Sequence, residues 1–439
     1  MYDPIRASDA VILRLRANHP SLIDLTTGRV ERLLAALGHP EQRLPPVIHV
    51  AGTNGKGSTV AFLRAMAEAA GLKVHVLTSP HLVRFAERIR VAGELISDEG
   101  LEALISEVEA VNAGEPISFF EITTVLALQA FANTPADLCL IEVGLGGRFD
   151  ATNIFDAPAL SVITPVDYDH LEMLGPELSK IAWEKAGIIK AGRPVVVARQ
   201  MDEALEVITA EADGLAAPMS LMGRDFDAWE AGGRLLVQTD ERLLDLPPPA
   251  LFGPHQFDNA GLAVAALLTL NDARIDEDAM ARGLEATVWP ARFQRLSEGR
   301  LARMAAERGA VLWLDGGHNP HAGAALAQAL GRLTARDPRP VALISAMFAR
   351  KDAQGFFAPF ADLTPQVFAT GFDSPNAAPA EEIAAAARAA GLIVHTAADV
   401  TEALKAALAQ DGPAPHILIC GGLHFAGEVL AMDPETWPR

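Results

Sequence analysis

The sequence has little cysteine and no long apolar runs. Its 2 cysteines, Cys139 and Cys420, both lie in apolar segments typical of buried strands. Two thiols cannot build a disulfide framework, so a reducing cytoplasm is the compartment that we expect. No apolar stretch approaches the ~20 residues that span a bilayer. No charged-then-apolar leader opens the chain, and we expect no membrane partner.

Positive charge is also scarce. The chain has 36 lysines and arginines against 56 aspartates and glutamates, which gives a formal net charge of −20. Such a balance opposes nonspecific binding to nucleic acid or to anionic lipid. Any anionic ligand therefore needs a local basic pocket. We expect a monomer that binds small molecules and no nucleic acid.

Half of the 439 residues are hydrophobic, and the chain is long for a single core. Apolar strand-like runs alternate with helical patterns, which favours an α/β fold with a mostly parallel sheet covered on both faces. We expect an N-terminal α/β domain over 1–294, with a small β insertion near 217–250, and a C-terminal Rossmann-like domain over 295–439. The expected strands cover 47–51, 73–77, 137–143, 159–164 and 194–198, then 311–314, 341–346, 366–370, 392–395 and 416–420.

A glycine-rich loop separates the first expected strand from a helix. It carries Gly52, Gly55 and Gly57 together with Lys56 and Ser58. Glycines let backbone N–H groups turn toward phosphate oxygens, and the helix N-terminus and the lysine add positive charge. The match to G-x-x-x-x-G-K-[ST] is imperfect, because Lys56 comes two positions early. The alternative is an ordinary strand–helix turn that needs positive φ angles.

Polar side chains follow the next expected strands, at the sheet edge where open α/β folds bind ligands. Ser79 follows the second strand, Glu142 ends the third, and Asp167, Asp169 and His170 follow the fourth. Oxygen ligands suit Mg²⁺, and Glu142 is the acid that we prefer. The alternatives are a Ser-Pro turn at Ser79, a satisfied buried acid at Glu142 and a hydrogen-bonded turn residue at His170.

Several basic residues have two interpretations. Lys185 lies on an expected helix; there it would usually face solvent, but a buried lysine can lose its proton and take up CO₂ as a carbamate. The cluster of Arg84, Arg88, Arg90 and Arg148 is notable in so acidic a chain. These arginines bind substrate carboxylates or form surface ion pairs.

The later part of the chain has further candidate residues. Asn259 opens a helix, Arg292 lies near the expected junction at 294–299, and Asp315 ends the first strand of the second series. Asp315 and His318 both point to a ligand site at a strand end. The alternative is helix capping, which the run from Asp315 to Pro320 would satisfy.

These blocks, in this order, closely resemble the folylpolyglutamate synthase and dihydrofolate synthase family, a branch of the Mur-type ATP-dependent amide ligases. The resemblance covers nearly the whole chain. It also accounts for the early Lys56, because the phosphate loop of this family has the form seen at 52–58. The segments that carry it are 49–59, 79–82, 84–90, 142–153, 167–170, 184–190, 255–259, 292–294 and 315–320.

The resemblance implies roles for individual residues, with ATP and one or two Mg²⁺ ions as cofactors. Lys56, His170 and Lys185 match catalytic positions, and Lys185 matches the lysine that is carbamylated in the family. Ser79, Glu142 and His170 match magnesium ligands. The ATP-binding positions are Gly52, Thr53, Asn54, Gly55, Lys56, Gly57, Ser58, Asn259, Arg292 and Asp315. The substrate positions are Leu25, Thr26, Thr27, Gly28, Phe119, Phe120, Glu121, Ile122, Phe149, Asp150, Ala151 and His318.

Two segments depart from the family pattern. Thr26-Thr27 replaces the usual Gly-Leu in the pterin-side loop. Near the C-terminus, the run from Gly421 to His424 replaces a common Gly-Ser-Leu-Tyr, so a hydroxyl often associated with glutamate binding is absent.

The activity implied is ATP-dependent addition of L-glutamate to dihydropteroate, to tetrahydrofolate (poly)glutamates, or to both, through an acyl phosphate. We favour both substrates. A cell-wall Mur ligase is one alternative, but only 51 residues precede Gly52, too few for a nucleotide-sugar domain. A P-loop NTPase module without ligase activity is the other, and the second α/β series with Asp315 and His318 argues against it.

Overall fold

The computed structural model describes residues 7–19 and 26–438, and it divides into two compact units. The first contains residues 1–250 and 257–287, and the second contains 251–256 and 288–439. No helix in the described part of the chain combines the length and the apolarity needed to cross a membrane. The two units are described separately below.

The first unit is built on an eight-stranded sheet in the order β4-β3-β2-β5-β1-β6-β7-β8. Strands β2, β5, β1, β6, β7 and β8 pair in parallel, and β3 and β4 form an antiparallel edge. The central strands are buried along their whole length, as expected for a sheet covered on both faces. The strands are β1 Val47–Ala51, β2 Val74–Leu77, β3 Ile89–Val91, β4 Glu94–Leu95, β5 Leu138–Glu142, β6 Leu160–Ile163, β7 Val195–Val197 and β8 Met219–Leu221.

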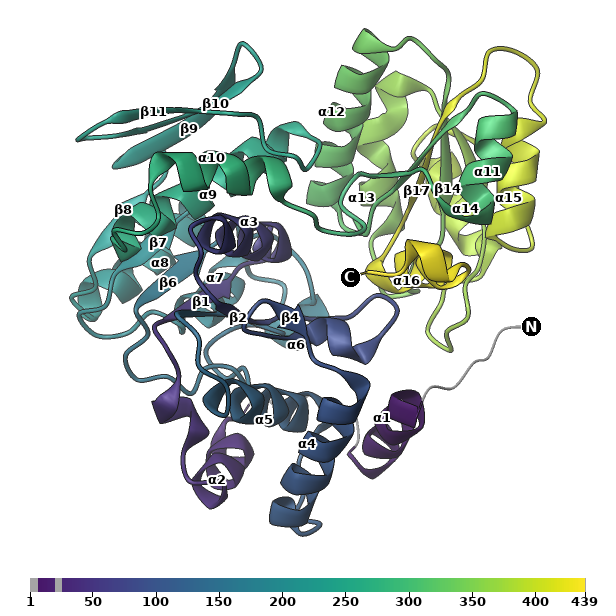
Figure 1. The fold of residues 1–439 in the computed structure, drawn as a ribbon. Helices are drawn as coiled ribbons and strands as arrows, with labels where there is room; N and C mark the ends of the chain where they lie inside the picture. The colour runs from purple at the N-terminus through teal and green to yellow at the C-terminus, as the bar shows by residue number, and fades with distance from the viewer. Residues whose placement is uncertain (1–6, 20–25, 439) are drawn as a thin grey trace. The chain divides into compact units, whose positions relative to one another are not determined.

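Helices cover both faces of this sheet, with α3 and α5 on opposite sides of β1 and β2 (Figure 1). The α5 side forms one core with Leu77, Cys139 and Ile141 of the strands. The helices of the unit are α1 Ala7–Asn18, α2 Gly28–Ala36, α3 Lys56–Ala69, α4 Asp98–Asn112, α5 Phe119–Ala132, α6 Leu171–Leu174, α7 Leu178–Ala186, α8 Asp202–Gly214, most of α9 Pro254–Leu270, and α10 Glu277–Ala286, with 3₁₀ turns at Pro40–Arg43 and Phe85–Arg88.

The expected β insertion is a three-stranded antiparallel sheet of β9 Phe226–Ala231, β10 Arg234–Thr239 and β11 Leu243–Leu246. It lies against α9, because a side chain at Gly261 would meet Ala228. The insertion is smaller than the expected 217–250, since β8 pairs with β7 and belongs to the main sheet.

The second unit holds a six-stranded sheet in the order β12-β13-β17-β14-β15-β16, in which only β12 is antiparallel. Residues 294–296, expected near a junction, form β12. The strands are β12 Gln294–Leu296, β13 Val311–Leu314, β14 Val341–Ser345, β15 Gln366–Ala369, β16 Ile393–Thr396 and β17 His416–Cys420. The helices are α11 Gly299–Glu307, α12 Pro320–Arg336, α13 Ala353–Phe357, α14 Ala380–Ala389, α15 Val400–Leu408 and α16 Leu423–Ala431, with 3₁₀ turns at Ala358–Leu363 and Pro434–Thr436.

Both sheets are α/β structures with the predicted parallel core, and the predicted fold class is confirmed.

Candidate active site

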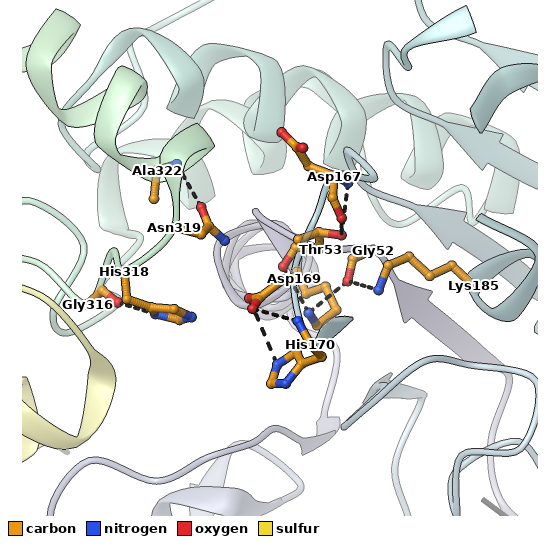
Figure 2. A network of polar contacts seen from close by, with 11 residues as sticks. Gly52, Thr53, Asp167, Asp169, His170, Lys185, Gly316, His318, Asn319 and Ala322 are labelled. Atoms are coloured by element: carbon orange, nitrogen blue, oxygen red, sulfur yellow. Dashed lines mark hydrogen bonds and ion pairs between the residues drawn. The ribbon is translucent and has the colours of Figure 1, made fainter. Parts of the chain in front are cut away.

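The glycine-rich loop joins the end of β1 to the start of α3. Gly55 precedes the helix with φ 88°, a left-handed conformation that favours glycine. The loop is held to the neighbouring strand end, because the Thr53 amide donates to the Pro165 carbonyl at 2.9 Å. The Thr53 hydroxyl also donates to the Asp167 carbonyl at 2.9 Å (Figure 2). A side chain at Gly55 would meet Asn259 Oδ1, so α9 brings the predicted Asn259 to this loop.

Two lysines converge on one carbonyl of the loop. Lys56 Nζ donates to the Gly52 carbonyl at 2.9 Å, and Lys185 Nζ donates to the same oxygen at 3.0 Å. Burial, and next the charge of Lys56, lower the pKa of Lys185 to about 7, while Asp169 opposes the shift. Both lysines, with His170 and Gly144–Gly146, line a small cavity of about 30 Å³. Lys185 is thus a buried amine beside the glycine-rich loop, not a solvent-facing one.

The predicted magnesium residues come from neighbouring strand ends. The Ser79 amide donates to Glu142 Oε2 at 3.2 Å, which joins the ends of β2 and β5. His170 lies on the cavity with Asp169, whose Oδ1 accepts from the His170 amide at 2.8 Å. Within 7–19 and 26–438, no group of three or more His, Cys, Asp and Glu side chains could hold a metal ion. Mg²⁺ commonly takes one or two carboxylates and completes its shell with phosphates and water, and Glu142 with the Ser79 hydroxyl fits that pattern.

A buried polar chain joins β1 to the loop after β5. Thr152 Oγ1 donates to Asp150 Oδ1 at 2.5 Å, and His49 Nε2 contacts the same hydroxyl at 2.9 Å. Since the hydroxyl proton goes to Asp150, we assign the Nε2 proton to His49. Asp150 also accepts from the Leu145 amide at 2.8 Å, and burial raises its pKa. The role of His49 and Thr152 was not predicted; the one signal was a histidine inside an apolar strand.

The predicted substrate segments have varied environments. Glu121 is buried, and its carboxylate accepts hydrogen bonds from Arg29 Nε at 3.0 Å and Arg29 Nη2 at 2.8 Å. The same side chain takes part in the capping box of α5. The Phe120 ring lies where a side chain at Gly144 would be, and Phe149 is 40 % exposed with its ring against Trp183.

Three other predicted substrate residues, Phe119, Ile122 and Ala151, are buried. Thr26 and Thr27 come just before α2, which begins at Gly28, and the Thr27 hydroxyl donates to Glu31 Oε1 at 2.6 Å. The predicted Leu25 lies outside the described residues.

Among the basic residues, Arg148 forms an ion pair. Its Nη2 lies 2.9 Å from Glu211 Oε1, and its Cζ lies 3.9 Å from the Trp183 ring centroid. The surface ion pair that we weighed against a ligand role is therefore present at Arg148.

In the second unit, Asp315 is buried at the end of β13. Its carboxylate accepts from the Phe293 amide at 2.7 Å and from the Gly317 amide at 2.6 Å, and burial raises its pKa while Arg292 opposes the rise. Helix capping falls to Asn319, which accepts from the Ala322 amide at 2.9 Å, and His318 Nδ1 contacts the Gly316 carbonyl at 3.0 Å (Figure 2). Asp315 and His318 thus do not cap α12.

Comparisons with known proteins agree with this organisation. Residues 50–267 match the Mur ligase middle domain, and residues 299–423 match the Mur ligase glutamate ligase domain. The class of protein is therefore a Mur-type ligase.

More specific relatives match nearly end to end. The dihydrofolate synthase/folylpolyglutamate synthase of Bacillus subtilis is 35% identical over 418 residues, 92% of this chain and 93% of the relative. The Escherichia coli FolC structure in complex with DHPP and ADP has a TM-score of 0.85 at 31% identity and covers 96% of both chains.

A bifunctional folylpolyglutamate synthase/dihydrofolate synthase structure with Mn, AMPPNP and L-glutamate bound has a TM-score of 0.83 at 32% identity and covers 97% of both chains. The chain belongs to the dihydrofolate synthase/folylpolyglutamate synthase family, and the predicted family is confirmed.

Proposed function

We propose that this ligase uses ATP to join L-glutamate to the carboxylate of dihydropteroate and of tetrahydrofolate (poly)glutamates, in folate biosynthesis. The observation that carries the proposal is the meeting of Lys56 and Lys185 on the Gly52 carbonyl of the phosphate loop. Relatives solved with ADP and DHPP, and with AMPPNP and L-glutamate, support the same substrates.

The chemistry is amide formation in two steps. A carboxylate is a poor electrophile, so its oxygen first takes the γ-phosphoryl group of ATP and ADP leaves. The amine of L-glutamate then attacks the carbonyl carbon of this acyl phosphate, and phosphate departs with one carboxylate oxygen. Lys56 and the loop amides hold the phosphates in line and offset their charge. His170 is the third catalytic residue that we propose, on the wall of the same cavity.

Ser79, Glu142 and His170 are the residues that would hold Mg²⁺. When bound, the ion supplies neutralising charge to the transferring phosphoryl group. Glu142 is 5 % exposed at its strand end, so its carboxylate stays fixed by the Ser79 amide and does not swing into solvent.

Lys185 is the residue that we propose to carry a carbamate. A pKa of about 7 leaves a large neutral fraction at neutral pH, and only the neutral amine reacts with CO₂. The carbamate would place a negative charge beside Lys56. Attraction between the carbamate and the Lys56 ammonium would then replace the repulsion between two ammonium groups.

The remaining assignments are also proposals. We assign Asn259, Arg292 and Asp315 to ATP, and His318 to the incoming glutamate. We also propose 1–294 as the ATP-binding domain, 295–439 as the glutamate-ligase domain, a monomer, and a cytoplasmic location consistent with the buried free thiols of Cys139 and Cys420.

An ADP-release assay tests the proposal. Purified protein is given ATP, Mg²⁺ and L-glutamate with dihydropteroate or with tetrahydrofolate, and the products are analysed by mass. We expect ADP and a pterin product longer by one glutamyl residue with each acceptor. ADP release that does not depend on a pterin would favour an NTPase module, and turnover with neither acceptor would contradict the proposal.

A further inference from the structure

Arg88, in the 3₁₀ turn Phe85–Arg88, is a buried cation that forms no ion pair with an acid in the described part of the chain. The residue is 8 % exposed, and its side chain makes one hydrogen bond to the residues that the structure describes, from Nε to His81 Nδ1 at 2.8 Å. Among the residues that the structure describes, it forms no ion pair. Arginine is almost never buried without a paired acid, because its desolvation is costly. This guanidinium therefore lacks the anion that would normally accompany it.

The acids near Arg88 are already engaged. Glu87 accepts the backbone amides of residues 82–84 at 2.8, 2.9 and 2.6 Å, and Glu142 accepts the Ser79 amide. Both carboxylates favour the charged form of Arg88 electrostatically, yet burial and the nearby Arg16 still lower its pKa to about 10. Since the one hydrogen bond that Arg88 makes within 7–19 and 26–438 uses Nε, its two terminal nitrogens keep the N–H groups that can bind a carboxylate.

Arg16 of α1 is a second cation on the same cluster. It is exposed, it forms no ion pair within the described residues, and its Cζ lies 5.1 Å from the ring centroid of Phe119. The Phe119 ring meets the Phe85 ring at 5.9 Å, and Arg88 Cζ lies 5.8 Å from the Phe85 ring. Two mutually repelling arginines thus each lie against one ring of a phenylalanine pair, in a chain with a net charge of −20.

The two substrate classes differ in how many carboxylates they carry. Dihydropteroate has one carboxylate, and it is the one that reacts. A folate also carries the α-carboxylate of its terminal glutamate, which is not consumed and must be bound by a cation or stay solvated. An acidic protein repels such a dianion unless it offers local positive charge.

We propose that Arg88 and Arg16 bind the unreacted α-carboxylate of the folate's terminal glutamate, beside the Phe85–Phe119 ring pair. The inference rests on the proposed function, and it makes the two arginines determinants of specificity for folates over dihydropteroate. Arg88 supplies the buried fork, and Arg16 closes the site from the exposed side.

Equilibrium binding tests this inference without turnover. Tetrahydrofolate is compared with an analogue in which 4-aminobutyrate replaces the glutamate, so that only the α-carboxylate is missing; both are titrated with a nonhydrolysable ATP analogue present. We expect Arg88→Met and Arg16→Met to weaken tetrahydrofolate about 10- to 100-fold, the range for lost charge-assisted hydrogen bonds, and to leave the analogue within about twofold. Arg274→Met, which removes an exposed arginine paired with Asp137 and Asp272, is the matched control.

The outcomes separate the two proposals. If wild type binds tetrahydrofolate and the analogue equally, or if the variants weaken both ligands equally, the α-carboxylate assignment is overturned and the proposed function stands. If the wild-type protein binds neither tetrahydrofolate nor the analogue, both the proposed function and this inference are overturned. Arg88→Lys keeps the charge but not the fork and should restore only part of the affinity. Arg16 is exposed, so Arg16→Met gives a folded variant even if Arg88→Met does not.

Discussion

At the scale of single residues, burial changes what Lys185 can do. Its amine lies against the Gly52 carbonyl with Lys56 on the same oxygen, so both desolvation and repulsion favour the neutral form. An exposed lysine at the same sequence position would keep its proton at neutral pH. Its sequence neighbours gave no indication of this, because burial depends on residues far away in the chain.

We predict that Lys185 takes up CO₂ with a pH dependence set by its pKa of about 7. Raising the pH from 6 to 8 increases the neutral fraction, and the carbamate should increase with it in the presence of ¹³C-bicarbonate, as measured by ¹³C NMR. The Lys185→Arg variant should give no carbamate signal. Its kcat should be lower by at least about a hundredfold, a loss typical of a charged group that acts at the reacting centre. A carbamate signal that persists in this variant would assign it to another amine.

A second prediction concerns Gly55 of the phosphate loop. Gly55→Ala introduces a side chain at φ +88° that also meets Asn259 Oδ1. We expect the KM for ATP to rise at least about tenfold, because the loop must shift away from its phosphate-binding geometry. Gly71→Ala is the matched control, since Gly71 has φ +83° with open space around it. Equal effects of the two substitutions on ATP binding would contradict the account.

At this scale a local motif was the easiest feature to predict. The sequence placed the glycine-rich loop between a strand and a helix, and the structure has it between β1 and α3, because its glycines, lysine and hydroxyls are consecutive. The absence of an ion pair at Arg88 among the described residues could not be predicted, since it depends on which other groups the neighbouring acids bind.

At the scale of elements, strand β1 and the loop after β5 are joined by His49, Thr152 and Asp150. The histidine is fully buried, and burial lowers its pKa to about 3. Because the unfolded state binds a proton below pH ~6.5 and the folded state does not until about pH 3, His49 makes stability fall as the pH drops through this window.

We predict that His49→Gln changes the acid sensitivity of folding. Glutamine can still donate to Thr152 but cannot be protonated, so the variant should lack a contribution of up to ~1.4 kcal/mol per pH unit between pH 6.5 and pH 4. Urea unfolding at several pH values should give free energies of unfolding for wild type and variant that differ at pH 7 and converge as the pH falls. Parallel curves would show that His49 does not titrate on unfolding.

The long central elements were predicted well and the edges were not. β1, β13 and β17 have the predicted bounds, because a continuous buried apolar run is visible in the sequence. The short strands β3, β4 and β12 were missed, since two or three residues at a sheet edge carry too little pattern. β8 was grouped with the insertion because its pairing with β7 is a tertiary contact.

At the scale of the whole molecule, two α/β units with separate sheets carry the candidate residues of one reaction. The sequence predicted both sheets from the alternation of strands and helices, but it did not give the activity, which rested on the family resemblance. The folate specificity proposed for Arg88 and Arg16 follows neither from the alternation of strands and helices nor from the family resemblance. It depends on an aromatic pair that the fold brings together.

In the proposed reaction, ATP activates the pterin carboxylate as an acyl phosphate before glutamate attacks. Transfer of ¹⁸O reports on this step: dihydropteroate labelled in its carboxylate is converted with ATP and L-glutamate, and the inorganic phosphate is analysed by mass spectrometry. We expect one labelled oxygen in each phosphate formed, with ADP and a product longer by one glutamyl residue. Unlabelled phosphate, or AMP in place of ADP, would contradict it.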